Sequence, residues 1–386
     1  MHRVRDIVVV GGGPAGLYAA HSLAGQGYDV LVLDRRHAIG ERVVCTGIVS
    51  KEAFDRFGLA LDSVLSKIQE LRLVSPRGSC LDYRHPEVLA YVVDRHRFDN
   101  QIRQWAHKSG AEIRLESIAK RVGVERDYVR VLVESSTRTY EIHAAVLVLA
   151  TGVQDRLQRQ LGLGVPTSYL RAAQAEFAIE HGGPTTVYVG QAVAPGGFAW
   201  VVPIGTGRCR VGLMTEGDAR ECFRGLLERL EKNVHQRAAR VDFKPIAQGL
   251  VSKAYADRVV AVGEAAGQIK TTTGGGIYFG LLGAEVAAQV IGQALKRADV
   301  SGRSLREYDR RWKRLMGGEI KLGLWARRLA GRLSDTEIER AFQAVRGDGF
   351  LSFAQKHARF DWHREVISYL LQMPGVREVV SRSAGL

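Results

Sequence analysis

The sequence is poor in cysteine and proline and contains no long apolar run. It has four cysteines and nine prolines in 386 residues, with no Cys-x-x-Cys pair. A structural zinc site or a secreted disulfide framework is therefore not expected, and we predict no metal. No stretch reaches the roughly 20 apolar residues that a membrane-spanning helix requires. With 46% hydrophobic and 25% charged residues, the composition is that of globular domains and not of a disordered chain.

Acidic residues are fewer than basic ones. There are 41 Asp and Glu against 55 Lys and Arg, a formal net charge of +14, which favours an anionic partner. The basic residues are scattered, are densest between residues 303 and 321, and accompany no aromatic RNA-reading motif, so we predict no nucleic-acid partner. An anionic membrane surface, a phosphorylated substrate and an acidic redox partner fit the charge equally well.

The N-terminus superficially resembles a signal peptide, because basic residues precede an apolar run at residues 7–10. Asp6 and the Gly-Gly-Gly-Pro stretch that follows argue against this interpretation, since a secretory core is not ordinarily broken in this way. We expect a cytoplasmic protein whose chain starts at Met1. A peripheral position on the inner face of the membrane is left open.

The glycine-rich stretch after the apolar run has the Gly-x-Gly-x-x-Gly spacing of dinucleotide-binding turns. Gly11 allows a tight turn, Gly13 lets backbone N–H groups approach a pyrophosphate, and Gly16 lets the next helix pack closely on the strand. A second apolar run, residues 30–33, ends in Asp34, which is placed to accept hydrogen bonds from a ribose. The cofactor-binding residues predicted here are Gly11, Gly13, Pro14, Ala15, Gly16, Asp34 and Arg35.

This turn occurs in NAD-binding and FAD-binding proteins alike, so the cofactor must be identified from other segments. Three segments are informative: residues 91–99, 146–152 and 259–283. Together with the turn they resemble the flavoproteins typified by aromatic hydroxylases. More closely, they resemble the geranylgeranyl reductase family, which reduces isoprenoid double bonds. The resemblance implies FAD as the cofactor.

The same resemblance implies further cofactor contacts. Family members have an acid at the position of Glu264 that contacts the ribityl chain, usually Asp, and an arginine at the position of Arg95 that reaches the phosphates or ribityl. The glycine turn and helix N-terminus near residue 276 lie against the pyrophosphate and flavin ring, where a side chain would block the flavin and the dipole stabilises negative charge. The residues implied are Arg95, Ala119, Thr151, Gly152, Glu264, Gly274, Gly275, Gly276 and Ile277.

An aromatic-x-Trp-x-x-Pro stretch, typical of geranylgeranyl reductases, occurs here as Phe198, Trp200 and Pro203. Alternation on a strand would place both rings on one face, a suitable wall for an apolar polyene. The alternative is that both rings fill the core of the second domain. We predict Phe198 and Trp200 as active-site residues.

A Cys-x-Gly stretch, Cys45 to Gly47, matches one that family members carry next to the isoalloxazine. The resemblance implies that Cys45 and Gly47 belong to the active site. A thiol there would donate a proton to the alkene carbon opposite the hydride or guide the substrate, whereas most free cysteines are simply small buried hydrophobes.

The predicted fold class is α/β, with a Rossmann-like FAD-binding domain, a mostly antiparallel sheet domain for the substrate and a C-terminal helical region. The FAD-binding domain is expected to be discontinuous, at residues 1–60, 88–165 and 250–300. Residues 61–87 and 166–249 would form the sheet domain, and residues 301–386 the helical region. Candidate helices there cover residues 303–330, 335–345 and 363–372, and their apolar faces fit packing on the protein itself or on a membrane surface.

The predicted function is an FAD-dependent reductase that saturates C=C bonds of a geranylgeranyl or other polyprenyl group by hydride transfer from reduced flavin. The alternatives are an FAD monooxygenase or halogenase on the same fold, a flavoprotein that passes electrons to quinone, and an isomerase in which the flavin is redox-silent. A second Gly-x-Gly-x-x-Gly unit is missing, so the electron donor is left open between NADPH and a ferredoxin-like protein. The expected substrate is an isoprenoid or prenylated lipid.

Overall fold

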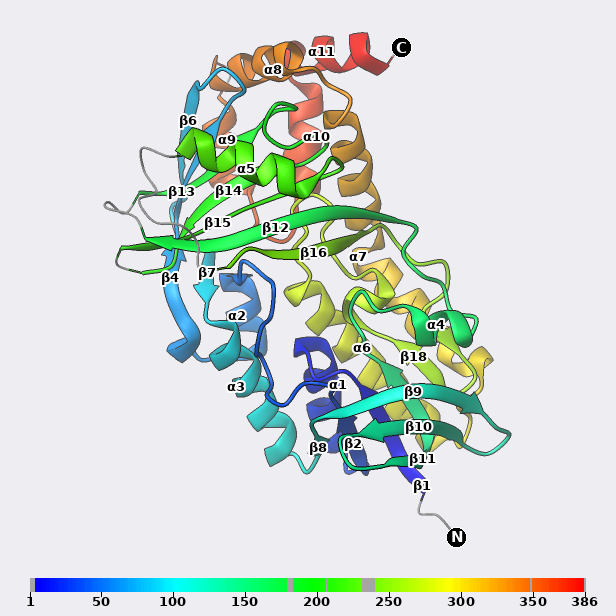
Figure 1. The fold of residues 1–386 in the computed structure, drawn as a ribbon. Helices are drawn as coiled ribbons and strands as arrows, with labels where there is room; N and C mark the ends of the chain where they lie inside the picture. The colour runs from blue at the N-terminus through cyan, green and yellow to red at the C-terminus, as the bar shows by residue number, and fades with distance from the viewer. Residues whose placement is uncertain (1–3, 179–182, 206, 231–239, 348, 385–386) are drawn as a thin grey trace.

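The computed structural model describes residues 4–178, 183–205, 207–230, 240–347 and 349–384. Two large sheets dominate it: one in the lower half of the view, with strands from the N-terminal and middle parts of the chain, and one crossing the upper half (Figure 1). Helices from the C-terminal part of the chain lie at the top. The cavity that concerns function lies between the two sheets.

The first sheet has five parallel strands in the order β18-β11-β1-β2-β8. Its central strand, β1, is buried on both faces at residues 7–10, as its run of branched apolar residues predicts. The antiparallel strands β9 and β10 extend β11, and β17 pairs with β18. The bounds are β1 Val4–Val10, β2 Val30–Leu33, β8 Glu112–Arg114, β9 Ser117–Val124, β10 Val129–Ser135, β11 Thr139–Leu149, β17 Tyr255–Ala256 and β18 Val259–Ala261.

Three helices pack together beside this sheet: α1 (Pro14–Ala24) lies between α3 (Arg95–Lys108) and α6 (Ile277–Lys296). Among the described residues, α6 is the one helix long and apolar enough to cross a membrane, and 78% of its most apolar window is buried inside the molecule. It is therefore packed as a core helix. The short helix α4 (Arg156–Gln160) and the 3₁₀ turn η2 (Gly263–Ala266) lie at the edge of the same unit.

The second sheet has seven strands in the order β16-β12-β15-β14-β13-β5-β6 and is antiparallel except where β13 pairs with β5. Helix α5 (Ala219–Leu230) packs on its outer face. The bounds are β5 Glu70–Val74, β6 Cys80–Arg84, β12 Ser168–Ala178, β13 Thr185–Val189, β14 Phe198–Pro203, β15 Arg208–Thr215 and β16 Asp242–Gln248. The fold class predicted from the sequence is confirmed.

A small sheet joins the two units. It consists of β3 (Ile48–Ser50), β7 (Ala90–Val93) and β4 (Val64–Ile68), with the short helix α2 (Lys51–Phe57) after β3 and the 3₁₀ turn η1 (Leu61–Ser63) before β4. β4 differs from the expectation for residues 61–87, because it pairs with β7 and not with the seven-stranded sheet. The register of this pairing depends on tertiary contacts that the strand's own sequence does not encode.

The C-terminal region is helical. Its helices are α7 (Gly302–Ala330), α8 (Asp335–Gly347), α9 (Phe350–His357), α10 (Arg364–Gln372) and α11 (Pro374–Ala384). On α7 the side chains of Trp312, Met316 and Ile320 are fully buried, while Leu315 and Trp325 are about half exposed. The apolar residues of α7 therefore divide between the protein core and the surface.

Candidate active site

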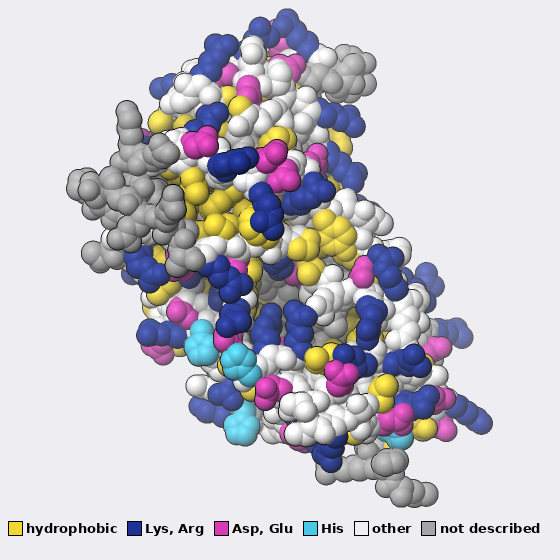
Figure 2. Space-filling view, viewed as in Figure 1, with side chains coloured by type: hydrophobic (Ala, Val, Ile, Leu, Met, Phe, Trp, Pro, Cys, Tyr) yellow, Lys and Arg dark blue, Asp and Glu magenta, His cyan; other side chains and the backbone are white. Residues whose placement is uncertain are grey.

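A cavity of about 680 Å³ opens between the carboxyl ends of the parallel strands and the inner face of the seven-stranded sheet. This volume lies in the usual range for cofactor sites. Figure 2 shows Lys and Arg side chains across the middle of the molecule, where the cavity opens. The basic lining residues are Arg35, Arg36, Arg95, Lys120, Arg156 and Lys244. The lining is therefore suited to an anionic ligand.

The first glycine turn forms one wall. Gly11 has φ +114°, and a Cβ there would overlap the carbonyl oxygen of Ala150; a Cβ on Gly16 would overlap the carbonyl oxygen of Gly11. Gly13 differs, because no described heavy atom lies within 4 Å of its Cβ position. Gly13 is also the N-cap residue of α1, and no described side chain caps this helix. The N–H groups of the first turn therefore face open space at the positive end of the helix, which is a suitable place for a phosphate.

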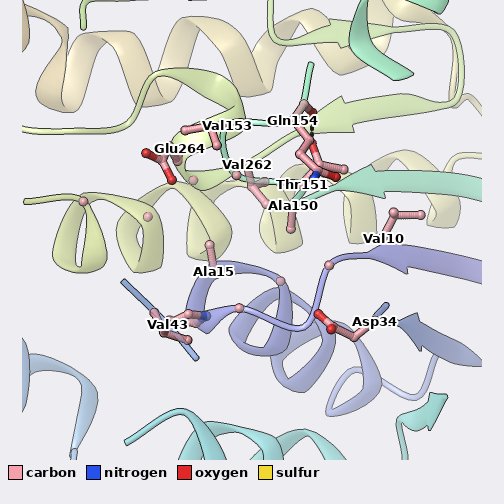
Figure 3. A pocket seen from close by; sticks show the side chains of 18 of the residues that line it. Val10, Ala15, Asp34, Val43, Ala150, Thr151, Val153, Gln154, Val262 and Glu264 are labelled. Carbon is pink, nitrogen blue, oxygen red and sulfur yellow. Dashed lines mark hydrogen bonds between the residues drawn. The ribbon is translucent and has the colours of Figure 1, made fainter. Parts of the chain in front are cut away.

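Asp34 closes this end of the cavity. It is buried, its Oδ2 accepts a 2.6 Å hydrogen bond from the Gly12 N–H, and its Oδ1 accepts one of 2.8 Å from the Arg36 N–H. The carboxylate is therefore held in one orientation with its remaining lone pairs available to a ribose. Figure 3 shows Asp34 and Glu264 on opposite sides of Ala15.

A second helix N-terminus, that of α6, faces the same cavity through residues 274–276. Its preceding loop closes on itself, because the Gly274 N–H donates to the Lys270 carbonyl at 2.8 Å and the Lys270 N–H donates to the Gly275 carbonyl at 2.9 Å. Gly274 has φ +71°, which favours glycine. The loop thus presents backbone, without side chains, to the cavity.

The C-terminal region holds this loop from behind. Nζ of Lys270 lies 2.6 Å from Oδ1 of Asp361, with 5% and 3% of the two side chains exposed. Nδ1 of His363 lies 2.6 Å from Oγ1 of Thr272. Residues 360–363 are therefore a structural support of the site.

Glu264 lines the cavity near this loop, and its Oε2 is 2.9 Å from Nζ of Lys244 on β16. Lys244 comes from the seven-stranded sheet and was not predicted as a site residue. The ion pair joins the two units directly across the cavity.

Arg95, at the start of α3, is nearly buried and makes a two-pronged ion pair with Asp99, at 2.9 and 2.8 Å. Its guanidinium also contacts the Cys45 thiol. Burial alone would lower the pKa of Arg95, but Asp99 and Cys45 raise it above its ordinary value. Arg95 is therefore a fixed cation beside the cysteine.

The Cys45 loop is tied to the inner face of the seven-stranded sheet. Gln174 on β12 accepts a 2.7 Å hydrogen bond from Thr46 Oγ1 and donates one of 3.3 Å to the Cys45 carbonyl. Arg210 on β15 donates to the Thr46 carbonyl at 2.7 Å. Gly47, with φ +76°, completes the turn: its carbonyl accepts from the Val93 N–H at 2.8 Å.

Phe198 and Trp200 lie on one face of β14, as their alternation predicts, with ring centroids 5.7 Å apart. Gly212 is the register partner of both Trp200 and Gln174, and a Cβ on Gly212 would lie 2.5 Å from the indole. The two rings belong to an apolar cluster that includes Leu170, Met214 and Ile246. Because Met214 and Ile246 border Gly274, this cluster meets the cavity at the second glycine turn.

The structure brings the predicted cofactor residues together, although they come from distant parts of the chain. Those lining the cavity are Gly11, Gly13, Pro14, Ala15, Gly16, Asp34, Arg35, Cys45, Arg95, Ala119, Thr151, Gly152, Glu264, Gly274, Gly275, Gly276 and Ile277. Gly47, Phe198 and Trp200 do not line it: Gly47 is buried behind Cys45, and the two rings pack in the adjacent apolar cluster.

Several lining residues were not predicted, among them Arg36, Ser117, Gln154, Arg156 and Lys244. Gln154 follows the Thr151–Gly152 turn and accepts a 2.8 Å hydrogen bond from Thr151 Oγ1 through its carbonyl (Figure 3). The pairing of Arg95 with Asp99, four residues later on one helix, was a usable sequence signal. Lys244 gave no such signal, because only the packing of the two sheets brings it to the cavity.

These residues fit a flavin dinucleotide. The open position at Gly13, the two helix N-termini and the ribose-facing Asp34 suit a pyrophosphate with its sugar, and the side-chain-free loop at residues 274–276 suits a flat ring. The apolar cluster borders that loop at Gly274.

Comparison with known proteins supports this interpretation. Residues 5–190 match the family model described as pyridine nucleotide-disulphide oxidoreductase. A digeranylgeranylglycerophospholipid reductase of Methanocaldococcus jannaschii is 31% identical over 363 residues, which cover 89% of this chain and 91% of the relative.

Solved structures share the fold. A geranylgeranyl bacteriochlorophyll reductase-like protein from Thermoplasma acidophilum has a TM-score of 0.87 at 22% identity, with all of both chains covered. A p-nitrophenol 4-monooxygenase from Pseudomonas putida has a TM-score of 0.73 at 20% identity, covering 97% of this chain and 99% of that one. The fold alone therefore does not separate reductases from hydroxylases, but the sequence match along the chain does: this chain is a flavin-dependent oxidoreductase of the digeranylgeranylglycerophospholipid reductase family.

Proposed function

We propose that this chain holds FAD in the cavity and saturates C=C bonds in the prenyl chains of a glycerophospholipid. The observation that carries the proposal is the junction at Gly274, where a polar cavity fitted to a dinucleotide meets a cluster of aromatic and aliphatic side chains. A polyprenyl chain needs an apolar wall beside the flavin, and this junction supplies one. The names of the sequence relatives support the same substrate class.

Reduction of an isolated C=C bond requires few acid and base residues. When bound and reduced, the flavin supplies a hydride to one alkene carbon, and a proton must reach the other. Because an unactivated alkene offers no carbonyl to polarise, the protein contributes mainly by positioning the bond and excluding water. Phe198 and Trp200 are proposed to hold the polyene, and Cys45 to face the reacting bond from the loop that Gln174 and Arg210 fix.

The electron donor is proposed to be external. A transiently bound nicotinamide and a small acidic ferredoxin-like protein remain the two alternatives, and the net charge of +14 favours the second only if the complex forms at low ionic strength.

The test follows the flavin itself. The purified protein is reduced under anaerobic conditions, a phospholipid carrying two geranylgeranyl chains is added, and flavin reoxidation and product mass are followed together. We expect reoxidation with a gain of two hydrogens per turnover. Discharge by oxygen only with an aromatic substrate would establish the monooxygenase alternative, and discharge by quinone alone would establish electron transfer.

A glycine pair provides the matched control. Gly212→Ala places a methyl group against the Trp200 indole and should slow lipid-driven reoxidation by at least about tenfold, through loss of positioning. Gly225→Ala on α5, where no described heavy atom lies within 4 Å of the Cβ position, should leave the rate unchanged. Both variants should retain the flavin, since neither glycine lines the cavity.

A further inference from the structure

Helix α7 carries an exposed stripe of basic and apolar residues along its second half. The stripe consists of Arg314, Leu315, Lys321, Leu322, Trp325 and Arg328, which recur at helical spacing on one side of the helix. All of them are exposed except Leu322, which is partly buried. Leu315 is 46% and Trp325 48% exposed, so two large apolar side chains lie in water between cations. Lys and Arg side chains line the upper right edge of the molecule in Figure 2, beside α7 in Figure 1.

No acidic residue lies within the stripe, but Glu307, seven positions before Arg314, lies on the same side of the helix. Within α7, which the structure describes in full, Glu319 is buried and accepts hydrogen bonds from the backbone N–H groups of His363 and Arg364, and the exposed Glu307 lies before the stripe. The neighbouring helix α10 adds Arg364, beside Gly318, and an exposed acid, Glu365. The stripe itself is purely cationic and apolar.

Helix α10 lies next to α7 and carries partly buried apolar residues. It contains Val366, Ile367, Leu370 and Leu371, and none of its residues is buried within the described chain.

The buried side of α7 packs against the loop at residues 270–276, which borders the cavity and is called the flavin loop below. The Ile320 carbonyl accepts a 2.7 Å hydrogen bond from Thr271 Oγ1, and a Cβ on Gly323 would lie 3.0 Å from Cγ2 of Thr272. Since a helix is about 10 Å across, the stripe lies roughly one helix diameter from the loop that borders the cavity.

We propose that the α7 stripe docks on the surface of an anionic phospholipid bilayer, with Leu315, Leu322 and Trp325 inserted at the interface and the basic residues beside the headgroups. Charge complementarity favours an anionic bilayer as the binding partner, because the stripe combines cations with apolar anchors, as interfacial helices do. Its use in bringing a lipid to the site rests on the proposed function, but the docking itself does not.

The test is sedimentation of the full-length protein with vesicles of phosphatidylglycerol and phosphatidylcholine, against vesicles of phosphatidylcholine alone. We expect binding to the anionic vesicles that weakens as salt is raised. The triple variant Arg314→Gln, Lys321→Gln, Arg328→Gln should bind on the order of 100-fold more weakly, at about fivefold per charge. Trp325→Ala should weaken binding to both the neutral and the anionic vesicles.

A second triple variant is the matched control. Lys108→Gln, Arg121→Gln, Arg126→Gln removes the same charge from exposed positions elsewhere and should bind like the wild type. Equal weakening of both triple variants would overturn the proposal in favour of a net-charge effect. The proposal would also be overturned if the α7 triple variant bound vesicles like the wild type. It would be overturned equally if ultracentrifugation showed a wild-type dimer that Trp325→Ala dissociates. Because no turnover is measured, these results are independent of whether the lipid is reduced.

Discussion

Nη1 of Arg210 donates a 2.7 Å hydrogen bond to the carbonyl oxygen of Thr46, which ties the seven-stranded sheet to the cysteine loop of the flavin-binding unit. The same nitrogen reaches the Val93 carbonyl at 3.1 Å, and Nε donates to Glu176 at 3.0 Å. Arg210 is buried and serves the two carbonyls as a donor, whereas Glu176 also pairs with Arg208. The residue thus fixes the distance between Cys45 and the wall that holds Trp200.

Arg210→Met should therefore cost about 2 to 3 kcal/mol of unfolding free energy, because two carbonyls lose their donor. Flavin content should persist, while the rate of lipid reduction falls by about tenfold as the loop loosens. Thermal unfolding and single-turnover reoxidation measure the two effects. Arg208→Met on the same strand, exposed and paired with the same Glu176, is the control and should change stability by less than about 1 kcal/mol. Equal effects of the two variants would contradict the positioning role.

The first glycine turn offers a second comparison. Gly13→Ala adds a methyl group where no described heavy atom lies within 4 Å, so stability should change by no more than about 1 kcal/mol while flavin retention falls. Gly16→Ala places a methyl group against the Gly11 carbonyl and 2.9 Å from Cβ of Ala150. This variant should lose about 3 kcal/mol of unfolding free energy. Flavin absorbance per protein and denaturant unfolding distinguish the two. A Gly13→Ala protein that retains its flavin fully would show that the cofactor phosphates lie elsewhere.

Lys270 and Asp361 are nearly inaccessible to solvent, and the pair joins the flavin loop to the C-terminal segment. Removing one partner, as in Lys270→Met or Asp361→Leu, should destabilise the protein by about 3 to 5 kcal/mol, because the other charge stays buried without its counter-ion. The double variant should recover most of that loss. Denaturant midpoints of the four proteins give the coupling energy, and strictly additive losses would show that the pair does not interact.

The sequence was sufficient for the parts of the site that are local in the chain. The glycine spacing, the acid after the second strand and the turn at residues 263–276 each carry their geometry in a few consecutive residues, and the structure places all of them at one cavity. The long helix α7 was predictable because its periodicity extends over many turns, and α6 was predictable from its Ala-rich composition.

Residues whose role depends on packing were not predictable in this way. Lys244, Gln174 and Arg210 lie on alternating positions of strands in the other sheet, and only the docking of the two sheets aims them at Glu264 and the cysteine loop. Helices α9 and α11 were not predicted, and length does not set them apart, because α10 has 9 residues and was predicted while α11 has 11. The ion pair of Lys270 joins residues 91 positions apart in the chain, which no local pattern reveals.

His363 gives the flavin loop a pH-dependent stability. Its Nε2 lies 2.9 Å from the Phe360 carbonyl, which can only accept, so Nε2 carries the proton and Nδ1 accepts from Thr272 Oγ1 in the neutral ring. Burial and the nearby Lys270 ammonium lower the pKa of His363 from 6.5 to about 4. Between these two pH values His363 is protonated in the unfolded chain and neutral in the folded protein, so stability decreases as the pH falls through this window. Above it, His363 does not contribute to the pH dependence of stability.

We therefore expect His363→Asn to flatten the profile of unfolding free energy against pH. The difference between wild type and variant should change by about 2 kcal/mol across the window, after allowance for the partial exposure of the residue. Carboxylates titrate in the same range, so the comparison is made as a difference, with His107→Asn at an exposed position of α3 as the control. Denaturant unfolding at closely spaced pH values is the measurement. If both the His363 and the His107 variants keep the wild-type slope, the neutral imidazole does not hold the loop, and the hydrogen bond from Thr271 to the Ile320 carbonyl of α7 remains to hold it.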